Sequence, residues 1–135
     1  MIRVGCCGTF DYELHDGHKE FIEYCSHFGK VTVFVTADIT VQANKGHLPK
    51  YSQKLRMRNL KPLVDNVVML LGIPDKDQQI ILNCNLDYYI FGPDQNTGWD
   101  KTLKRYLEMV GVQVIYFWHK KKFSTTKILK EKGLI

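Results

Sequence analysis

Strand signals and helix signals alternate along the whole chain, and this alternation constrains the fold more than any other feature. Short apolar runs, several rich in β-branched residues, predict buried strands at residues 2–7, 31–38, 66–71, 88–91 and 112–117. Amphipathic segments predict helices at residues 17–28, 52–61, 75–82, 100–110 and 124–132. Strands that alternate with helices form parallel βαβ units. The sequence therefore predicts one α/β domain, residues 1–135, that is Rossmann-like and doubly wound around a parallel sheet of about five strands.

Composition limits the classes of protein and partner. The first ten residues lack the long apolar region of a signal peptide, and no apolar run approaches the roughly 18 residues of a membrane span. The cysteines, Cys6, Cys7, Cys25 and Cys84, form no CxxC pair. We therefore expect a cytoplasmic protein with reduced thiols and no membrane association. The net charge of +5 favours an anionic partner, although charge alone leaves nucleic acid, a membrane surface and a polyphosphate open.

The turn after the first predicted strand carries the first candidate site, CGTFDYELHDGH at residues 7–18. In doubly wound sheets, ligands bind beyond the carboxyl ends of the strands. His15 and His18 stand at the start of a helix, where backbone N–H groups attract phosphate and imidazoles can stabilise developing negative charge. Gly17 allows the backbone to approach a triphosphate closely. The alternative is that His18 continues the apolar stripe of the helix as a core residue, but the pair of histidines favours the phosphate site.

This segment resembles a known signature. GTFD followed by HxGH is similar to the motifs of the cytidylyltransferase-like nucleotidyltransferases, which include glycerol-3-phosphate cytidylyltransferases and archaeal-type FAD synthetases. The resemblance implies that Gly8, Thr9 and Phe10 contact the nucleotide and that His15 and His18 are catalytic. The chain departs from the pattern in one respect, because three residues rather than the usual two separate Asp11 from His15. The extra residue must bulge the turn.

The second candidate site is NKGHLPKYSQKLRMR, residues 44–58. Lysines in a Gly/Pro loop followed by helical arginines suit a clamp over a triphosphate, and the alternative is a solvated basic loop. The resembled family has a lysine in this loop and then a Ser-x-x-x-Arg segment. By that resemblance Lys45 is catalytic, and Ser52 with Arg56 binds the nucleotide.

Two further segments lie near the carboxyl ends of later strands. FGPDQ places Asp94 and Gln95 where a base or acceptor can bind, and its final Asp-Gln is similar to the Gly-Tyr-Asp-Gln of archaeal-type FAD synthetases. The segment KKKFSTTKIL is similar to the Ile-Ser-Thr-Thr-Lys-Ile ending of glycerol-3-phosphate cytidylyltransferases. That resemblance implies phosphate contacts from Ser124, Thr125 and Thr126.

Together these segments predict a nucleotidyltransferase that joins an NMP unit to a phosphorylated small molecule and releases pyrophosphate. CTP and an acceptor such as glycerol 3-phosphate are favoured, with FMN adenylylation by ATP as one alternative and a non-catalytic nucleotide-binding domain as another. Mg²⁺ is expected to arrive with the triphosphate, so no metal ligands of the protein's own are predicted. Nucleic acid is not an expected partner, because the lysines lie in discrete loops without interleaved aromatic residues. A homodimer is an open expectation.

Overall fold

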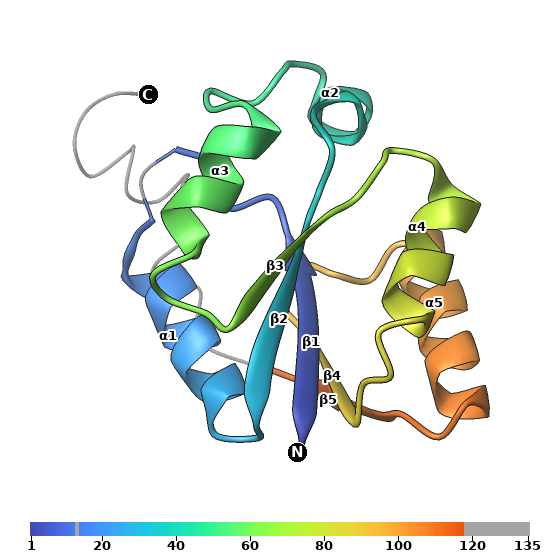
Figure 1. Cartoon of the computed structure of the whole chain (residues 1–135). Coiled ribbons are helices and arrows are strands. Elements are labelled where there is room, and N and C mark those ends of the chain that lie inside the picture. The colour runs from blue at the N-terminus through green and yellow to red at the C-terminus, as the bar shows by residue number, and fades with distance from the viewer. Residues whose placement is uncertain (13, 118–135) are drawn as a thin grey trace.

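The computed structural model describes residues 1–12 and 14–117, which form a parallel sheet of five strands with helices on both of its faces (Figure 1). The strands are β1 (Arg3–Gly8), β2 (Lys30–Val35), β3 (Asn66–Met69), β4 (Tyr88–Phe91) and β5 (Gln113–Tyr116). The helices are α1 (Asp16–Ser26), α2 (Asp38–Lys45), α3 (Gln53–Leu60), α4 (Pro74–Leu82) and α5 (Gly98–Met109). The predicted Rossmann-like fold with five parallel strands is confirmed.

The order of the strands, β3-β2-β1-β4-β5, creates a switch point at the centre of the sheet. The chain builds outward from β1 through β2 to β3, and then returns to add β4 on the other side of β1. The carboxyl ends of β1 and β4 therefore begin loops that diverge to opposite sides. A crevice between such loops is the ligand site of doubly wound folds.

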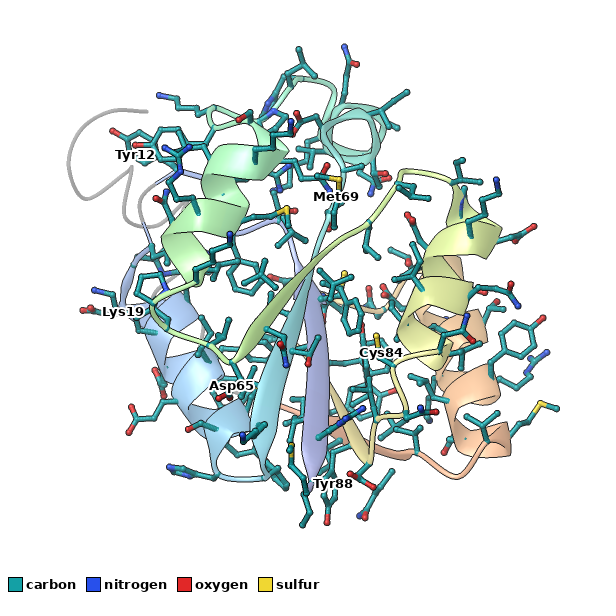
Figure 2. The ribbon with its side chains drawn as sticks, in the orientation of Figure 1. Tyr12, Lys19, Asp65, Met69, Cys84 and Tyr88 are labelled. Atoms are coloured by element: carbon teal, nitrogen blue, oxygen red, sulfur yellow. The ribbon has the colours of Figure 1, made fainter. Side chains whose placement is uncertain are left out.

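Two apolar clusters hold the helices against the sheet. One lies between the sheet and the helices α1 and α3, and includes Val4, Phe21 and Leu60. The other lies against α4 and α5, and includes Ile81 and Leu103. Side chains on successive strand residues alternate between the faces, so Cys6 enters the first cluster and Cys7 the second. Figure 2 shows both layers, with Tyr88 at the amino end of the sheet and Met69 toward the carboxyl end.

Helix α2 corrects the sequence prediction. We expected a strand to residue 38 and then an irregular basic stretch, whereas β2 ends at Val35 and residues Asp38–Lys45 are helical. The helical signal was weak because α2 buries one residue, Val41, and follows an N-cap alanine that has no polar side chain. Gly46, with a φ of 80°, ends the helix in the left-handed conformation. In Figure 1, α2 lies beyond the carboxyl ends of the strands.

The helix predicted at residues 124–132 lies outside the described residues. The same holds for the predicted phosphate ligands Ser124, Thr125 and Thr126.

Candidate active site

A cleft of about 700 Å³ opens at the carboxyl ends of the strands. It lies among the loop after β1, the start of α1, helix α2, and the segments that lead into α4 and α5. Nine of the residues selected from the sequence line it: Gly8, Thr9, Phe10, His15, Gly17, His18, Lys45, Asp94 and Gln95. Residues from four separate predicted segments were expected to converge, and three of these segments do so within the described chain.

The loop after β1 is held in a tight, specific conformation. The Thr36 side chain and backbone N–H both donate to the carbonyl of Gly8, each at 3.1 Å, which ties the ends of β1 and β2 together. A Cβ atom on Gly8 would lie 2.5 Å from the Phe10 ring, so glycine is required there. Phe10 and Tyr12 have positive φ values of 49° and 61°. Both residues are thus in the left-handed region, which non-glycine residues seldom adopt.

His15 and His18 cap the amino end of α1 reciprocally. Nδ1 of His15 accepts hydrogen bonds from the N–H groups of Gly17 (3.0 Å) and His18 (3.3 Å), and Nδ1 of His18 accepts from His15 N–H (3.4 Å). The two rings stack with centroids 3.7 Å apart. A neutral imidazole whose Nδ1 accepts carries its proton on Nε2. Each ring is therefore set to act as an Nε2–H donor.

The charge state of His18 supports this assignment. Burial lowers the pKa of His18 to about 4, and electrostatic interactions with His15 and Lys45 lower it further. His18 is therefore neutral near pH 7 and presents an N–H group rather than a full charge. A bound phosphate would reverse part of this shift, since an anion favours the imidazolium form.

Lys45 lies in the last turn of α2, not in a loop as the sequence suggested. It is exposed and lines the same cleft as His15 and His18. The expected convergence of the lysine and the imidazoles is thus observed, while their catalytic roles remain predictions.

Gln95 occupies the cleft differently from what we expected. Its Oε1 accepts from Gly92 N–H at 2.8 Å, and its Nε2 donates to the carbonyl of Cys7. Both polar atoms of the side chain thus bind backbone groups, whereas we predicted a contact with the base or acceptor. The neighbouring Asp94 lines the cleft from the same turn.

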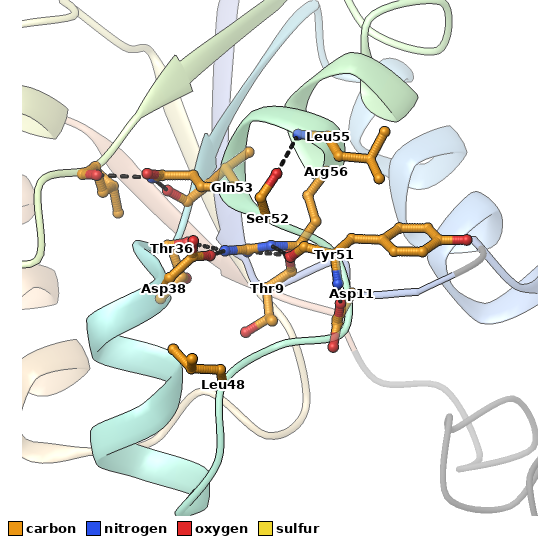
Figure 3. Close-up of polar contacts among 12 residues, drawn as sticks. Thr9, Asp11, Thr36, Asp38, Leu48, Tyr51, Ser52, Gln53, Leu55 and Arg56 are labelled. Carbon is orange, nitrogen blue, oxygen red and sulfur yellow. Dashed lines mark hydrogen bonds and ion pairs between the residues drawn. The ribbon is translucent and has the colours of Figure 1, made fainter.

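Arg56 is the clearest departure from the predicted site. Its guanidinium is completely buried, and within the described residues it is not part of the cleft lining. It donates to the carbonyls of Tyr51, Thr9 and Thr36, and it pairs with Asp38 at 2.6 Å (Figure 3). Arg56 therefore connects segments that line the cleft, and its own guanidinium does not line it. Ser52 caps α3 by accepting from Leu55 N–H at 3.3 Å.

Comparison with known proteins gives the family. The model for cytidylyltransferase-like proteins matches residues 6–131, nearly the whole chain. The chain belongs to the cytidylyltransferase-like family. A similar solved structure, the lipopolysaccharide core biosynthesis protein from Thermoplasma volcanium GSS1, superposes with a TM-score of 0.76 at 23% identity. The alignment covers 90% of this chain and 99% of that protein, which supports the shared fold.

Family membership supports nucleotidyltransferase activity in general and makes a nucleotide the expected ligand of the cleft. Over residues 1–12 and 14–117, none of the helices is long and apolar enough to cross a bilayer. All four cysteines are described and carry free thiols.

Several residues that shape the cleft of this cytidylyltransferase-like chain were missed in the sequence. Asp77 is buried, and its carboxylate accepts from Leu71 N–H (2.6 Å) and Gly72 N–H (3.1 Å). Trp99 donates from Nε1 to the Pro74 carbonyl and so joins the starts of α4 and α5. In the sequence, Asp77 follows Pro74 in the first turn of a predicted helix, where an acidic residue is common. Its role depends on a loop that no local pattern defines.

Asp11, the last residue of GTFD, fastens the β1 loop to the segment before α3. Its carboxylate accepts from the N–H groups of Tyr12 (2.8 Å), Lys50 (2.9 Å) and Tyr51 (2.9 Å). Partial burial raises its pKa, but the three backbone hydrogen bonds and the charge of Arg56 outweigh this, and the net pKa lies below the usual 3.8. The ionised carboxylate thus stabilises the fold.

We expect Asp11→Asn to lower the free energy of unfolding by about 1–2 kcal/mol near neutral pH. Because the folded-state pKa is depressed, the contribution of Asp11 is complete above the unfolded pKa and disappears as pH falls through the folded value. Urea unfolding of both proteins between about pH 7 and pH 3 checks this expectation. A difference that stays constant down to pH 3 would contradict it.

Proposed function

We propose that this protein transfers an NMP unit from a nucleoside triphosphate, with CTP favoured, to a phosphorylated small molecule such as glycerol 3-phosphate. One observation carries the proposal. Two stacked imidazoles at a helix N-terminus and a lysine from a different element line the same cleft. Such a group of donors matches the needs of phosphoryl-type transfer, in which positioning and charge stabilisation supply most of the catalysis.

The reaction is a direct in-line displacement. A phosphate oxygen of the acceptor forms a bond to the α-phosphorus, the bond from that phosphorus to the bridging oxygen breaks, and pyrophosphate leaves with the electron pair. The acceptor oxygen is already anionic, so no protein nucleophile is required. The Nε2–H groups of His15 and His18 donate to oxygens of the α-phosphate as charge grows, and Lys45 neutralises the departing pyrophosphate.

The backbone contributes a second positive element. The amino end of α1 carries the partial charge of its helix dipole, and Gly17 is buried there beside the imidazoles. Gly8, Thr9 and Phe10 form the opposing loop, which a base or ribose can contact with backbone groups. The amino end of α1 and the loop after β1 would thus enclose the triphosphate between them.

In this proposal Mg²⁺ would enter the cleft with the triphosphate. The described residues contain no group of three His, Cys, Asp or Glu side chains that could hold a metal. Asp77 uses both carboxylate oxygens for backbone N–H groups, while Asp94 lines the cleft. When bound, Mg²⁺ would neutralise phosphate oxygens and retain several waters.

A release assay for pyrophosphate tests the proposal. CTP and ATP should each be offered with glycerol 3-phosphate and with FMN, and we expect turnover with CTP and glycerol 3-phosphate. Turnover with ATP and FMN would instead establish the adenylyltransferase alternative, which the Asp94-Gln95 sequence favours. Nucleotide binding without turnover for every pair would make the chain a non-catalytic binding domain.

A further inference from the structure

The pairing between β1 and β4 is incomplete at the carboxyl ends of the strands. Among the described residues these two strands pair at Val4 with Tyr88 and at Gly5 with Tyr89. β1 nevertheless continues to Gly8 alongside β2, and β4 continues to Phe91 alongside β5. The two central strands therefore separate as they approach the cleft.

The Gln95 carboxamide lies across this separation. Gly92 N–H, just after β4, donates to Oε1, and Nε2 donates to the Cys7 carbonyl near the end of β1. A primary amide has the same acceptor and donor as a peptide group. The side chain thus acts as a hydrogen-bonded spacer between two strands that no longer reach each other.

The spacer also fixes the turn that faces the nucleotide. Gln95 N–H donates to the carbonyl of Gly92 at 3.2 Å, and the side chain of the same residue accepts from Gly92 N–H. Asp94 lies within this doubly closed turn and lines the cleft. The bond to Cys7 then connects the turn to the strand that leads directly into Gly8, Thr9 and Phe10.

We propose that Gln95 is a positioning residue that sets the separation of the β1 loop and the β4 turn, and through it the affinity of the cleft for the nucleotide. This inference rests on the proposed function, since it assumes that a nucleotide occupies the cleft. Gln95 acts through backbone geometry and not by touching the base. Its removal leaves the partly buried Cys7 carbonyl and Gly92 N–H group without these hydrogen bonds, and the β1 loop and the β4 turn are then no longer joined.

The first test compares wild type with Gln95→Met, which keeps the length of the side chain and loses both hydrogen bonds. Without nucleotide, the Gly92 amide should exchange with solvent faster in the variant, as followed by NMR. With nucleotide, calorimetry should show a Kd for CTP or ATP weaker by about tenfold or more. Both proteins are measured at a temperature at which circular dichroism shows them fully folded.

The second test uses Gln95→Glu and a pH profile. A protonated carboxyl group can accept from Gly92 and donate to Cys7, but a carboxylate facing the Cys7 carbonyl cannot donate and is repelled. Burial beside a carbonyl raises the pKa of such a carboxyl group. We expect the ratio of variant Kd to wild-type Kd to approach one near about pH 5 and to exceed about tenfold near pH 8.

Dividing the variant Kd by the wild-type Kd cancels the effect of the other titratable groups that line the cleft, because both proteins contain these groups. They come from β1, α1, α2, α4, the β4 turn and α5: Cys7, His15, His18, Lys45, Asp77, Asp94 and Asp100. Gln79→Glu is the matched control, since Gln79 is exposed on α4 and should give a ratio near one at every pH.

The outcomes separate this inference from the proposed function. If wild type binds neither nucleotide, the proposed function fails. Independently, if the Gly92 amide exchanges at the same rate in wild type and in Gln95→Met, the role of Gln95 as a spacer is wrong. If wild type binds and Gln95→Met binds equally well, the inference is wrong while the proposed function stands. A ratio for Gln95→Glu that does not change with pH would also overturn it.

Discussion

His18→Ala should lower the rate of nucleotidyl transfer by about 10²–10³-fold while the protein remains folded. The expected loss follows from geometry, because Nδ1 of His18 is committed to the His15 backbone and the ring proton is on Nε2. His18 is neutral near pH 7, so the variant loses a hydrogen-bond donor to the transition state and not a fixed charge.

The stability cost of His18→Ala should be small. The variant loses one capping hydrogen bond of 3.4 Å at the start of α1, which is worth about 0.5–1 kcal/mol. Pyrophosphate release gives the rate, and thermal unfolding gives the stability of the same samples. His27→Ala, an exposed histidine at the other end of α1, serves as the control and should keep wild-type turnover.

The opposite result would favour a structural histidine. His18 packs against Phe10, with ring centroids 5.3 Å apart, and precedes the apolar residues Phe21 and Ile22 on the same helix. A variant that melts far below wild type but retains turnover when folded would show that His18 serves the core.

Arg56→Met should destabilise the protein by about 3 kcal/mol or more. The substitution leaves three backbone carbonyls and the Asp38 carboxylate without their donor, in a place where the guanidinium is completely buried. Asp38 is 39% exposed and can recover part of its hydration, which limits the loss. The midpoint of thermal unfolding should fall by about 10 °C or more.

Activity should decline with Arg56→Met even below the melting transition. Arg56 connects Thr9, in the β1 loop, to Thr36 and Asp38 at the start of α2, which carries Lys45 at its other end. Arg58→Met, an exposed arginine one half-turn along α3, is the control and should change stability little. A stable but inactive Arg56→Met would instead favour the direct contact with the nucleotide that the sequence suggested.

Lysine should not replace Arg56. A guanidinium offers five N–H donors in a planar arrangement, and its four hydrogen bonds here go to separate acceptors on three segments of the chain. An ammonium group with three donors cannot satisfy this set. We therefore expect Arg56→Lys to lose most of the stability that Arg56→Met loses, and urea unfolding of both variants would show it.

Features that depend on neighbours in the sequence could be predicted well. The alternation of strands and helices follows from local apolar periodicity, and the described residues form five parallel strands where about five were expected. The position of His15 and His18 at a helix start is equally local, because the capping box that they form joins residues three positions apart. Helix α2 escaped prediction since it is mostly exposed and its local signal is weak.

By itself, the sequence determined the parallel α/β fold, the pair of imidazoles at the start of α1 and the resemblance to a nucleotidyltransferase family. Only the tertiary structure decided the distant partners of Arg56, Gln95 and Asp11, which include groups 47, 88 and 40 positions away. A guanidinium or an amide has the same donors for a phosphate as for a backbone carbonyl. Which of them it meets depends on how distant strands are brought together, and local sequence patterns carry no record of that.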